Sequence, residues 1–222
     1  MALLTEESLR ALRLSPDQRT LCVAPGTVCS PSALDFLAVR GISLVFEEAQ
    51  THTAGQPKPE HLTHLRGDIL VPKTHPVIAF RGEMDALIAA LTEASAVCGL
   101  SKHACLCAEL AEITALCREI LRCEVTETPF VSTNIAGKTL DEYRAMSHDP
   151  QKHFGLAHPL PTPDMPIAAL RLNTLRTLVR RAELAAARAF LQGKSIERTD
   201  ILTALNRLSS VLYVLYLREL SL

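Results

Sequence analysis

Residues 164–193 constrain the fold more than any other stretch, because they read as a single long helix. Asp164 suits the N-cap, Pro166 the first turn and Gly193 the C-terminal stop. Small and aliphatic side chains recur at helical spacing and predict a packed stripe of Leu170, Leu178, Ala182 and Ala185. Leucine and alanine dominate the other apolar stretches and aromatic residues make up 4%, which favours helices over a β-sandwich.

Charged side chains lie beside this predicted stripe. Steps of four and three residues place Arg176, Arg180 and Glu183 on nearly one face, and Arg181 lies about 100° around the helix from Arg180. One interpretation is a solvated face whose aliphatic stems cover the core. The other is an anion site, because a guanidinium is always charged and matches phosphate oxygens. The helix alone leaves both interpretations open.

Three further helices are predicted, near residues 76–98, 101–123 and 199–220. Their predicted N-caps are Thr74 or His75, Ser101, and Thr199 or Asp200. Together with the long helix they predict a mainly α fold, a four-helix bundle with one long crossover. The crossover, residues 124–163, contains a short predicted helix near 140–146. Connections of this length are usually functional or disordered.

The start of the chain has a different pattern. Residues 1–48 predict a small α/β unit, in which Thr5 and Ser30 cap short helices and Gly41 ends the second one. Strands are expected at 20–24 and 42–46. Glycine and proline make residues 49–63 a predicted linker, so the bundle domain is expected to span residues 64–222.

Composition excludes several classes of function. A net charge of −1 provides no basic field of the kind that nucleic-acid binding requires. The most apolar stretch, residues 211–217, is far shorter than the ~20 residues of a membrane span. No signal peptide is visible either, so we expect a soluble cytosolic protein. The seven cysteines are an odd number and most lie in helical sequence, which favours reduced thiols.

Polar residues inside the predicted helices are candidates for a site. Asp85 lies among apolar neighbours and Asn206 lies in the middle of the last helix, and each needs a partner if it is buried. His103 and Cys107 are four residues apart and could share a helix face, whereas Cys105 points elsewhere. Buried cysteines acting as small hydrophobic residues are the favoured interpretation, so no metal site is predicted.

Two motifs near the C-terminus resemble a known family. Arg176-x-x-x-Arg180-Arg181-Ala182-Glu183, followed by Leu205-Asn206-Arg207-Leu208-Ser209, resembles the paired motifs of the ATP:corrinoid adenosyltransferases of the four-helix-bundle type. Residues 73–89 are similar to that family's first helix, with Asp85 at the position of the family's aspartate. Within the family, the chain is most similar to the ethanolamine-utilisation cobalamin adenosyltransferases, through residues 30–33, 71–76, 80–82, 149–154 and 205–210.

The resemblance implies a reaction in which cobalt(I) attacks C5′ of ATP and triphosphate leaves. The substrates are ATP, with Mg²⁺, and cob(I)alamin. Because cobalt(I) is itself a strong nucleophile, the reaction needs no catalytic Ser, Cys or general base. The protein must instead hold ATP in line, neutralise the leaving triphosphate and ease the reduction of cobalt(II).

The resemblance also implies roles for residues on the two C-terminal helices. Arg180 contacts the triphosphate and Asn206 the nucleotide. Arg176 pairs with Asp85, within the chain or across a subunit boundary. Glu183 orients the arginines or helps to place Mg²⁺.

Three further roles come from the same resemblance. Lys73 reaches a phosphate from the segment before the first bundle helix. Arg181 holds the nucleotide or the fold. Phe154 is the candidate for the apolar residue beneath the corrin, which would remove the axial ligand and make cobalt(II) easier to reduce.

The chain departs from its relatives in two places. It lacks the Gly/Thr-rich phosphate loop of the propanediol-type enzymes, so residues 73–75 must serve instead. It also lacks the His…Cys-Cys-x-x-Cys insert of some ethanolamine-type enzymes, since residues 56–64 contain no cysteine. We therefore expect no structural zinc or iron at that place.

The resemblance implies a homo-oligomer, with a trimer favoured, in the cytoplasm or inside a bacterial microcompartment. A cobalamin reductase and the cobalamin-dependent ammonia-lyase are the implied protein partners. Two alternatives stay open: a corrinoid or nucleotide carrier or sensor without catalysis, and a metal-binding bundle that uses His103, Cys105 and Cys107.

Overall fold

The computed structural model describes residues 3–12, 14–15, 18–23, 27–46, 50–51, 58–100, 103–131, 134–192 and 195–222. The chain divides into two compact units, one of residues 1–73 with 191–197 and one of residues 74–190 with 198–222. The predicted cap Ser101, the predicted stop Gly193 and linker residues 52–57 lie outside the described residues. The domain boundaries after residues 48 and 63 stay a prediction.

The N-terminal unit contains the predicted short helices and strands. Strand β1 (Leu3–Leu4) pairs in parallel with β3 (Val28–Cys29), and β2 (Thr20–Val23) with β4 (Ser43–Phe46). Helices α1 (Glu6–Ala11) and α2 (Pro31–Arg40) contact each other over a core of Leu9, Ala33, Leu37 and Ile42. As predicted, Thr5 and Ser30 cap these helices, and Gly41 ends α2 with a φ of 65°.

Short antiparallel strands complete this unit. Strands β5 (Gln50–Thr51), β7 (Ile69–Pro72) and β6 (Leu62–Arg66) form a sheet in the order β5-β7-β6. Strands β8 (Leu191–Gln192) and β9 (Ser195–Ile196) form a hairpin. None of these five strands was predicted from the sequence, because each is short and its pattern of alternation is weak.

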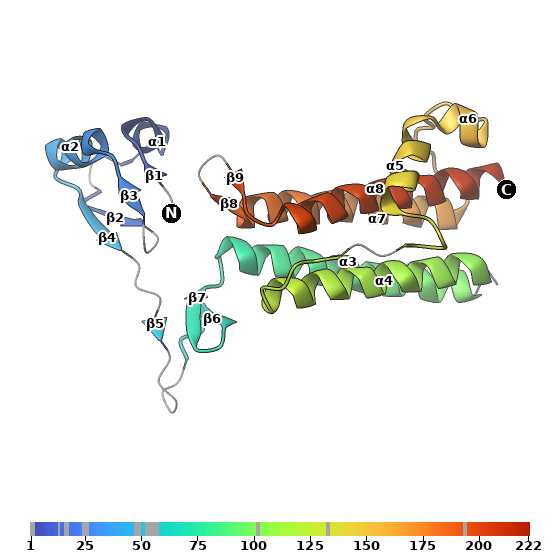
Figure 1. Ribbon diagram of the computed structural model, residues 1–222, viewed down its shortest axis with the longest axis horizontal. Helices are drawn as coiled ribbons and strands as arrows, with labels where there is room; N and C mark the ends of the chain where they lie inside the picture. The colour runs from blue at the N-terminus through green and yellow to red at the C-terminus, as the bar shows by residue number, and fades with distance from the viewer. Residues whose placement is uncertain are drawn as a thin grey trace. The chain divides into compact units, whose positions relative to one another are not determined.

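Four long helices make up most of the second unit: α3 (Pro76–Leu100), α4 (Ala104–Val125), α7 (Ile167–Ala189) and α8 (Thr199–Ser221). Helix α3 packs against α4 and α7, and α7 packs against α8, so that the four run lengthwise beside one another (Figure 1). Buried side chains of α3 recur in steps of three and four: Val77, Phe80, Met84, Leu87, Leu91, Ala94 and Cys98. That spacing keeps one stripe facing the neighbouring helices.

Helix α7 differs from the prediction at both ends and in its buried face. It starts at Ile167, after a turn in which the Met165 amide donates to the Thr162 carbonyl oxygen, and Pro166 rather than Asp164 is the N-cap residue. The helix is followed by Phe190, which packs edge-on against Phe80. The buried stripe is Ala168, Ala169, Leu172, Leu175, Val179, Ala182 and Ala186, so of the predicted stripe only Ala182 is buried.

The crossover from α4 to α7 is folded against α8. It contains α5 (Leu140–His148), which confirms the predicted short helix, and α6 (Pro150–Phe154). Both helices contact α8, and Figure 1 shows them at the end of the unit where α8 ends. Buried side chains anchor the crossover: Phe130, Ile135, Leu140 and Tyr143.

Charged side chains that are buried in this unit have partners. Arg81 on α3 donates to the buried carboxylate of Glu124 on α4 at 2.7 Å. Arg218 on α8 donates two hydrogen bonds of 2.6 Å to Glu109 on α4. Bidentate pairs of this kind are geometrically specific, so they favour one alignment of the helices.

Arg198 and Asp200 join the start of α8 to the end of α4. Arg198 donates to Asp200 and to the backbone carbonyl oxygens of Cys123 and Thr128, and the Phe130 amide donates to Asp200 at 2.8 Å. Burial opposes ionisation of Asp200, but the hydrogen bonds from Arg198, Phe130 and Ile201 outweigh it and lower the pKa of Asp200 to about 2.

We expect Asp200→Asn to destabilise the protein by about 1–2 kcal/mol near neutral pH. The unfolded carboxyl group has a pKa near 3.9, so the unfolded state binds more protons than the folded state between about pH 4 and pH 2. The stabilisation is therefore complete above that window and is lost as the pH falls through it. Urea unfolding of the wild type and of Asp200→Asn at pH 7, 5 and 3 measures the difference in their free energies of unfolding. A difference that is as large at pH 3 as at pH 7 would contradict a lowered pKa of Asp200.

Candidate functional site

The charged residues of α7 face two different neighbours. Glu183 Oε1 accepts a hydrogen bond of 2.9 Å from the Asn206 amide on α8. Arg181 donates across to Glu83 on α3 at 2.8 Å. Arg176 donates to Asn173, one turn earlier on α7, and its guanidinium lies 5.7 Å from the centre of the Tyr213 ring on α8. Side chains that the sequence placed close together therefore meet different helices.

Arg180 is exposed and has no hydrogen bond or ion pair with any described residue. It lines an open cavity of about 490 Å³ between α7 and the start of α8, together with Thr177, Arg181, Glu183, Leu184, Ala187 and Leu202. Pockets of this volume are typical of small-ligand sites. The guanidinium of Arg180 is thus available to an anion that enters this cavity.

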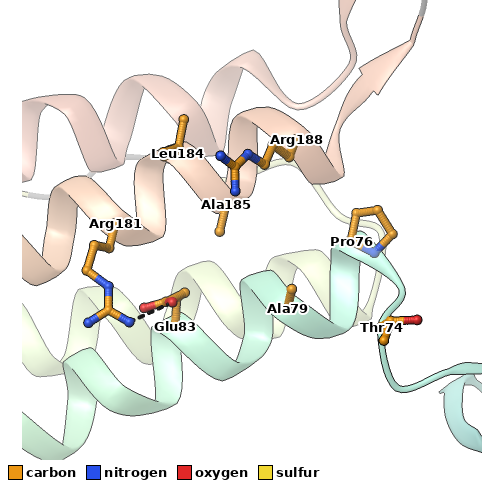
Figure 2. Close-up of a pocket in the computed structure, with 8 residues that line it drawn as sticks. All are labelled: Thr74, Pro76, Ala79, Glu83, Arg181, Leu184, Ala185 and Arg188. Atoms are coloured by element: carbon orange, nitrogen blue, oxygen red, sulfur yellow. Dashed lines mark hydrogen bonds and ion pairs between the residues drawn. The ribbon is translucent and has the colours of Figure 1, made fainter. Parts of the chain in front are cut away.

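A second cavity, of about 400 Å³, lies between α7 and the first turns of α3 (Figure 2). Arg181 and Arg188 extend from α7, and Thr74 and Pro76 lie at the start of α3 (Figure 2). Both cavities share Arg181 and Leu184, so they adjoin each other around α7. The positive end of the α3 dipole and the Arg188 guanidinium favour negative charge here, whereas Glu83, which also lines the cavity, offsets the charge of Arg181.

Arg188 was not among the residues predicted from the sequence. It is exposed and, like Arg180, makes no hydrogen bond or ion pair within the described residues. Its spacing of seven from Arg181, two helical turns, could have indicated it. Glu83 was also missed, and its Oε2 atom is buried without a hydrogen-bond partner among the described residues.

A third cavity, of about 350 Å³, lies beside Arg176 and is lined by Ser147, His148, His158, Arg176, Ser209, Ser210 and Tyr213. His158 Nδ1 and the Tyr213 hydroxyl are 2.7 Å apart, and their rings stack. Burial and the neighbouring Tyr216 raise the pKa of Tyr213, whereas Arg176 lowers it. The hydroxyl group is therefore held as a neutral hydrogen-bonding group.

Three further predicted site residues are Asp85, Lys73 and Phe154. Asp85 on α3 is exposed and has no hydrogen bond or ion pair with a described residue. Lys73 follows β7 in the N-terminal unit, where its Nζ lies 3.9 Å from Glu60. Phe154, on α6, is half-buried and its ring neighbours His153. The pairing of Asp85 with Arg176 stays a prediction for a contact between subunits.

His103, Cys105 and Cys107 do not converge. His103 Nδ1 lies 3.5 Å from Glu219 Oε2, Cys107 Sγ donates to the Ser95 carbonyl oxygen, and Cys105 is exposed. In the parts of the chain that the structure describes, no three His, Cys, Asp or Glu side chains are grouped as metal ligands would be. All seven cysteines are free thiols, and burial raises the pKa of Cys117 to about 12.

None of the described helices combines the length and the apolar character that crossing a lipid bilayer requires.

Comparison with known sequences identifies relatives of this chain. The model of the cobalamin adenosyltransferase family matches residues 55–219. The corrinoid adenosyltransferase EutT of Salmonella typhimurium is 35% identical over 167 residues, and that of Escherichia coli K12 is 33% identical over 159 residues. Each alignment covers 71% of this chain and 58% of the relative, so the chain spans less than two thirds of the length of these relatives.

Solved structures with a similar fold include two variants of the PduO-type ATP:corrinoid adenosyltransferase from Lactobacillus reuteri, both complexed with cobalamin and ATP. Their TM-scores are 0.55 and 0.56 at 21% sequence identity. The similarity covers 72% of this chain and 88% and 91% of theirs. This likeness concerns the mainly helical fold.

We expect Arg180→Ala to change the free energy of unfolding by less than about 0.5 kcal/mol, because an exposed side chain without described partners stabilises little. Arg81→Met serves as the sensitive control: it leaves the buried Glu124 carboxylate without its cation and should cost roughly 3–5 kcal/mol. Urea unfolding measures both. A loss above about 1 kcal/mol for Arg180→Ala would mean that Arg180 is part of the packing.

Proposed function

Because this chain belongs to the cobalamin adenosyltransferase family, we propose that it transfers the 5′-deoxyadenosyl group of ATP to cob(I)alamin and releases triphosphate. The observation that carries this proposal is the α7–α8 surface. Arg180, without a described partner, and the hydrogen-bonded pair Glu183–Asn206 lie there beside one cavity. A cation and a fixed amide suit the two ends of a nucleoside triphosphate.

We also infer that α3, α4, α7 and α8 form a four-helix bundle whose one long crossover carries α5 and α6. Bundles of this kind build ligand sites from side chains on facing helices, as α7 and α8 do here.

In the proposed reaction, cobalt(I) donates an electron pair to C5′ of ATP. A cobalt–carbon bond forms, the bond between C5′ and its oxygen breaks, and the electron pair leaves with triphosphate. Cobalt is thereby formally oxidised from +1 to +3. The leaving group gains negative charge as the bond breaks, so cations beside it lower the barrier.

The cationic side chains are assigned to this requirement. Arg180 contacts the triphosphate, with Arg188 in the adjoining cavity, and Arg181 holds the nucleotide or, through its ion pair with Glu83, the fold. Lys73, directly before Thr74, reaches a phosphate. Asn206 holds the nucleotide.

The other roles concern charge and cobalt. Glu183 orients Asn206 and helps to place Mg²⁺, which would neutralise part of the triphosphate charge. Phe154 covers the lower face of the corrin, where an apolar side chain removes the axial ligand.

The proposed setting is ethanolamine utilisation in the cytoplasm, free or inside a bacterial microcompartment. A cobalamin reductase would supply cobalt(I), and a cobalamin-dependent ammonia-lyase would use the product. The proposed assembly is a trimer in which Asp85 of one subunit pairs with Arg176 of the next.

Arg180→Ala should lower kcat/KM for ATP by about 100-fold or more, as the loss of a group that stabilises developing charge typically does. The assay mixes cob(I)alamin with MgATP without oxygen and follows the visible spectrum of the light-sensitive alkylcobalamin. Arg122→Ala, which removes an exposed arginine that pairs with Glu119 on α4, is the control and should retain full activity. Near-normal turnover of Arg180→Ala would contradict the proposed role of Arg180 at the triphosphate. If the wild type binds both substrates but forms no product, a carrier or sensor is favoured.

Sedimentation tests the proposed assembly. We expect the wild type to sediment as a particle of three times the 24.2 kDa chain mass. Asp85→Arg should dissociate it, because it places two cations opposite each other, and Asp85→Arg combined with Arg176→Asp should restore it. A wild-type monomer, or a trimer that Asp85→Arg leaves unchanged, contradicts the proposed contact.

A further inference from the structure

We propose that Asp141 and Arg207 are positioning residues that orient Asn206 for its nucleotide; this inference rests on the proposed function. Neither residue was assigned a role from the sequence. Arg207 follows Asn206 on α8, and Asp141 lies on α5 in the crossover, 66 residues away from Arg207.

The Asn206 amide is held at both ends by groups of opposite charge. Arg207 Nη1 donates to Asn206 Oδ1 at 2.8 Å, and Asn206 Nδ2 donates to Glu183 Oε1 at 2.9 Å. A half-turn of the amide would bring Oδ1 against a carboxylate and the NH₂ group against a guanidinium. Because both of these contacts are repulsive, one orientation is strongly preferred.

Arg207 is itself held by Asp141. Its Nε donates to Asp141 Oδ1 at 2.6 Å, so one guanidinium bridges α5 and Asn206. The Arg207 side chain is 19% exposed, whereas that of Asp141 is 81% exposed. The carboxylate therefore depends on its backbone for its position rather than on surrounding side chains.

The backbone of Asp141 is well fixed. It lies in the first turn of α5, which Thr139 and Glu142 close with a reciprocal capping box. Leu140 and Tyr143, on either side of it, are buried, and α5 packs on α8. A carboxylate in the first turn of a helix is also favoured by the helix dipole. The crossover thus holds the charge that keeps Arg207 in place.

This chain of contacts leaves Asn206 one free amide hydrogen and one free oxygen lone pair in a set orientation. A nucleotide therefore meets the same donor and acceptor each time it binds. Without Asp141, Arg207 can turn toward solvent and the amide loses one of its two restraints. The expected result is weaker binding of ATP, with little change in the fold.

The experiment uses three variants: Asp141→Asn, Arg207→Gln and the double variant that combines these two changes. Each is compared with a control variant, Glu93→Gln. The control removes another exposed ion pair between helices, Arg171–Glu93 at 2.9 Å, whose members do not contact Asn206. Calorimetry with MgATP alone gives the Kd, steady-state turnover gives KM and kcat for each substrate, and thermal unfolding gives the melting temperature.

We expect Asp141→Asn to raise the Kd and KM for ATP about fivefold and Arg207→Gln about tenfold, the range for one lost hydrogen bond. The double variant should equal Arg207→Gln, because Asp141 acts through Arg207. The KM for cob(I)alamin and the melting temperature should match those of Glu93→Gln.

The inference is overturned if Asp141→Asn binds ATP as tightly as the control does. It is also overturned if the two changes have additive effects on the Kd for ATP in the double variant. A KM change for cob(I)alamin as large as that for ATP also overturns it. If the wild type makes product normally, such results reject only the positioning role. A wild type that neither binds ATP nor makes adenosylcobalamin rejects the proposed function, and the inference with it.

Discussion

The burial of helix α8 is the constraint on which the helical unit depends. In its second half most side chains are buried, in a run that includes Val211, Leu212, Val214, Leu215, Tyr216 and Leu217. One stripe cannot produce such a run, so several neighbours must cover this part: α7, α5 and α6 pack on α8, and Arg218 joins it to α4. In its first half the buried residues lie on a single stripe, which leaves Asn206 exposed and Arg207 half-buried. The same helix thus supplies core residues and two residues of the proposed site.

The charged side chains also fall into two groups, one paired in the core and one exposed to solvent. Buried carboxylates such as Glu109 and Glu124 are paired with arginines, because an unpaired buried charge would be costly. On α7, by contrast, Arg180 and Arg188 are exposed and have no described partner. Water offsets the cost of leaving them unpaired, and a polyanion can replace that water with direct contacts. This difference separates the arginines that join helices from the two that are proposed to meet the triphosphate.

The sequence predicted helices correctly where a proline or a capping residue marked their start. The start of α3 at Pro76, the caps Thr5 and Ser30 and the short helix α5 all agree with the sequence analysis. The start of α7 was misjudged because Asp164 lies in the turn before the helix, where the Met165 amide donates to the Thr162 carbonyl oxygen. Its stripe was misjudged because alanine and leucine occur on all sides of α7, so that periodicity alone could not select the buried face. Strands β6 and β7 were missed because antiparallel pairing with each other, not the pattern of either one, defines them.

The sequence by itself determined the spacing of the charged residues on α7, because residues four and three apart on a helix must lie on nearly one face. It also determined the family, through motifs that are contiguous in the chain. Only the tertiary structure decided which partners these residues meet. Asn206 and Glu183 are 23 residues apart, Arg207 and Asp141 are 66 apart, and Arg181 and Glu83 are 98 apart. Contacts over such separations depend on how whole helices pack, and the free energy of that packing is spread over many apolar side chains that no single motif records.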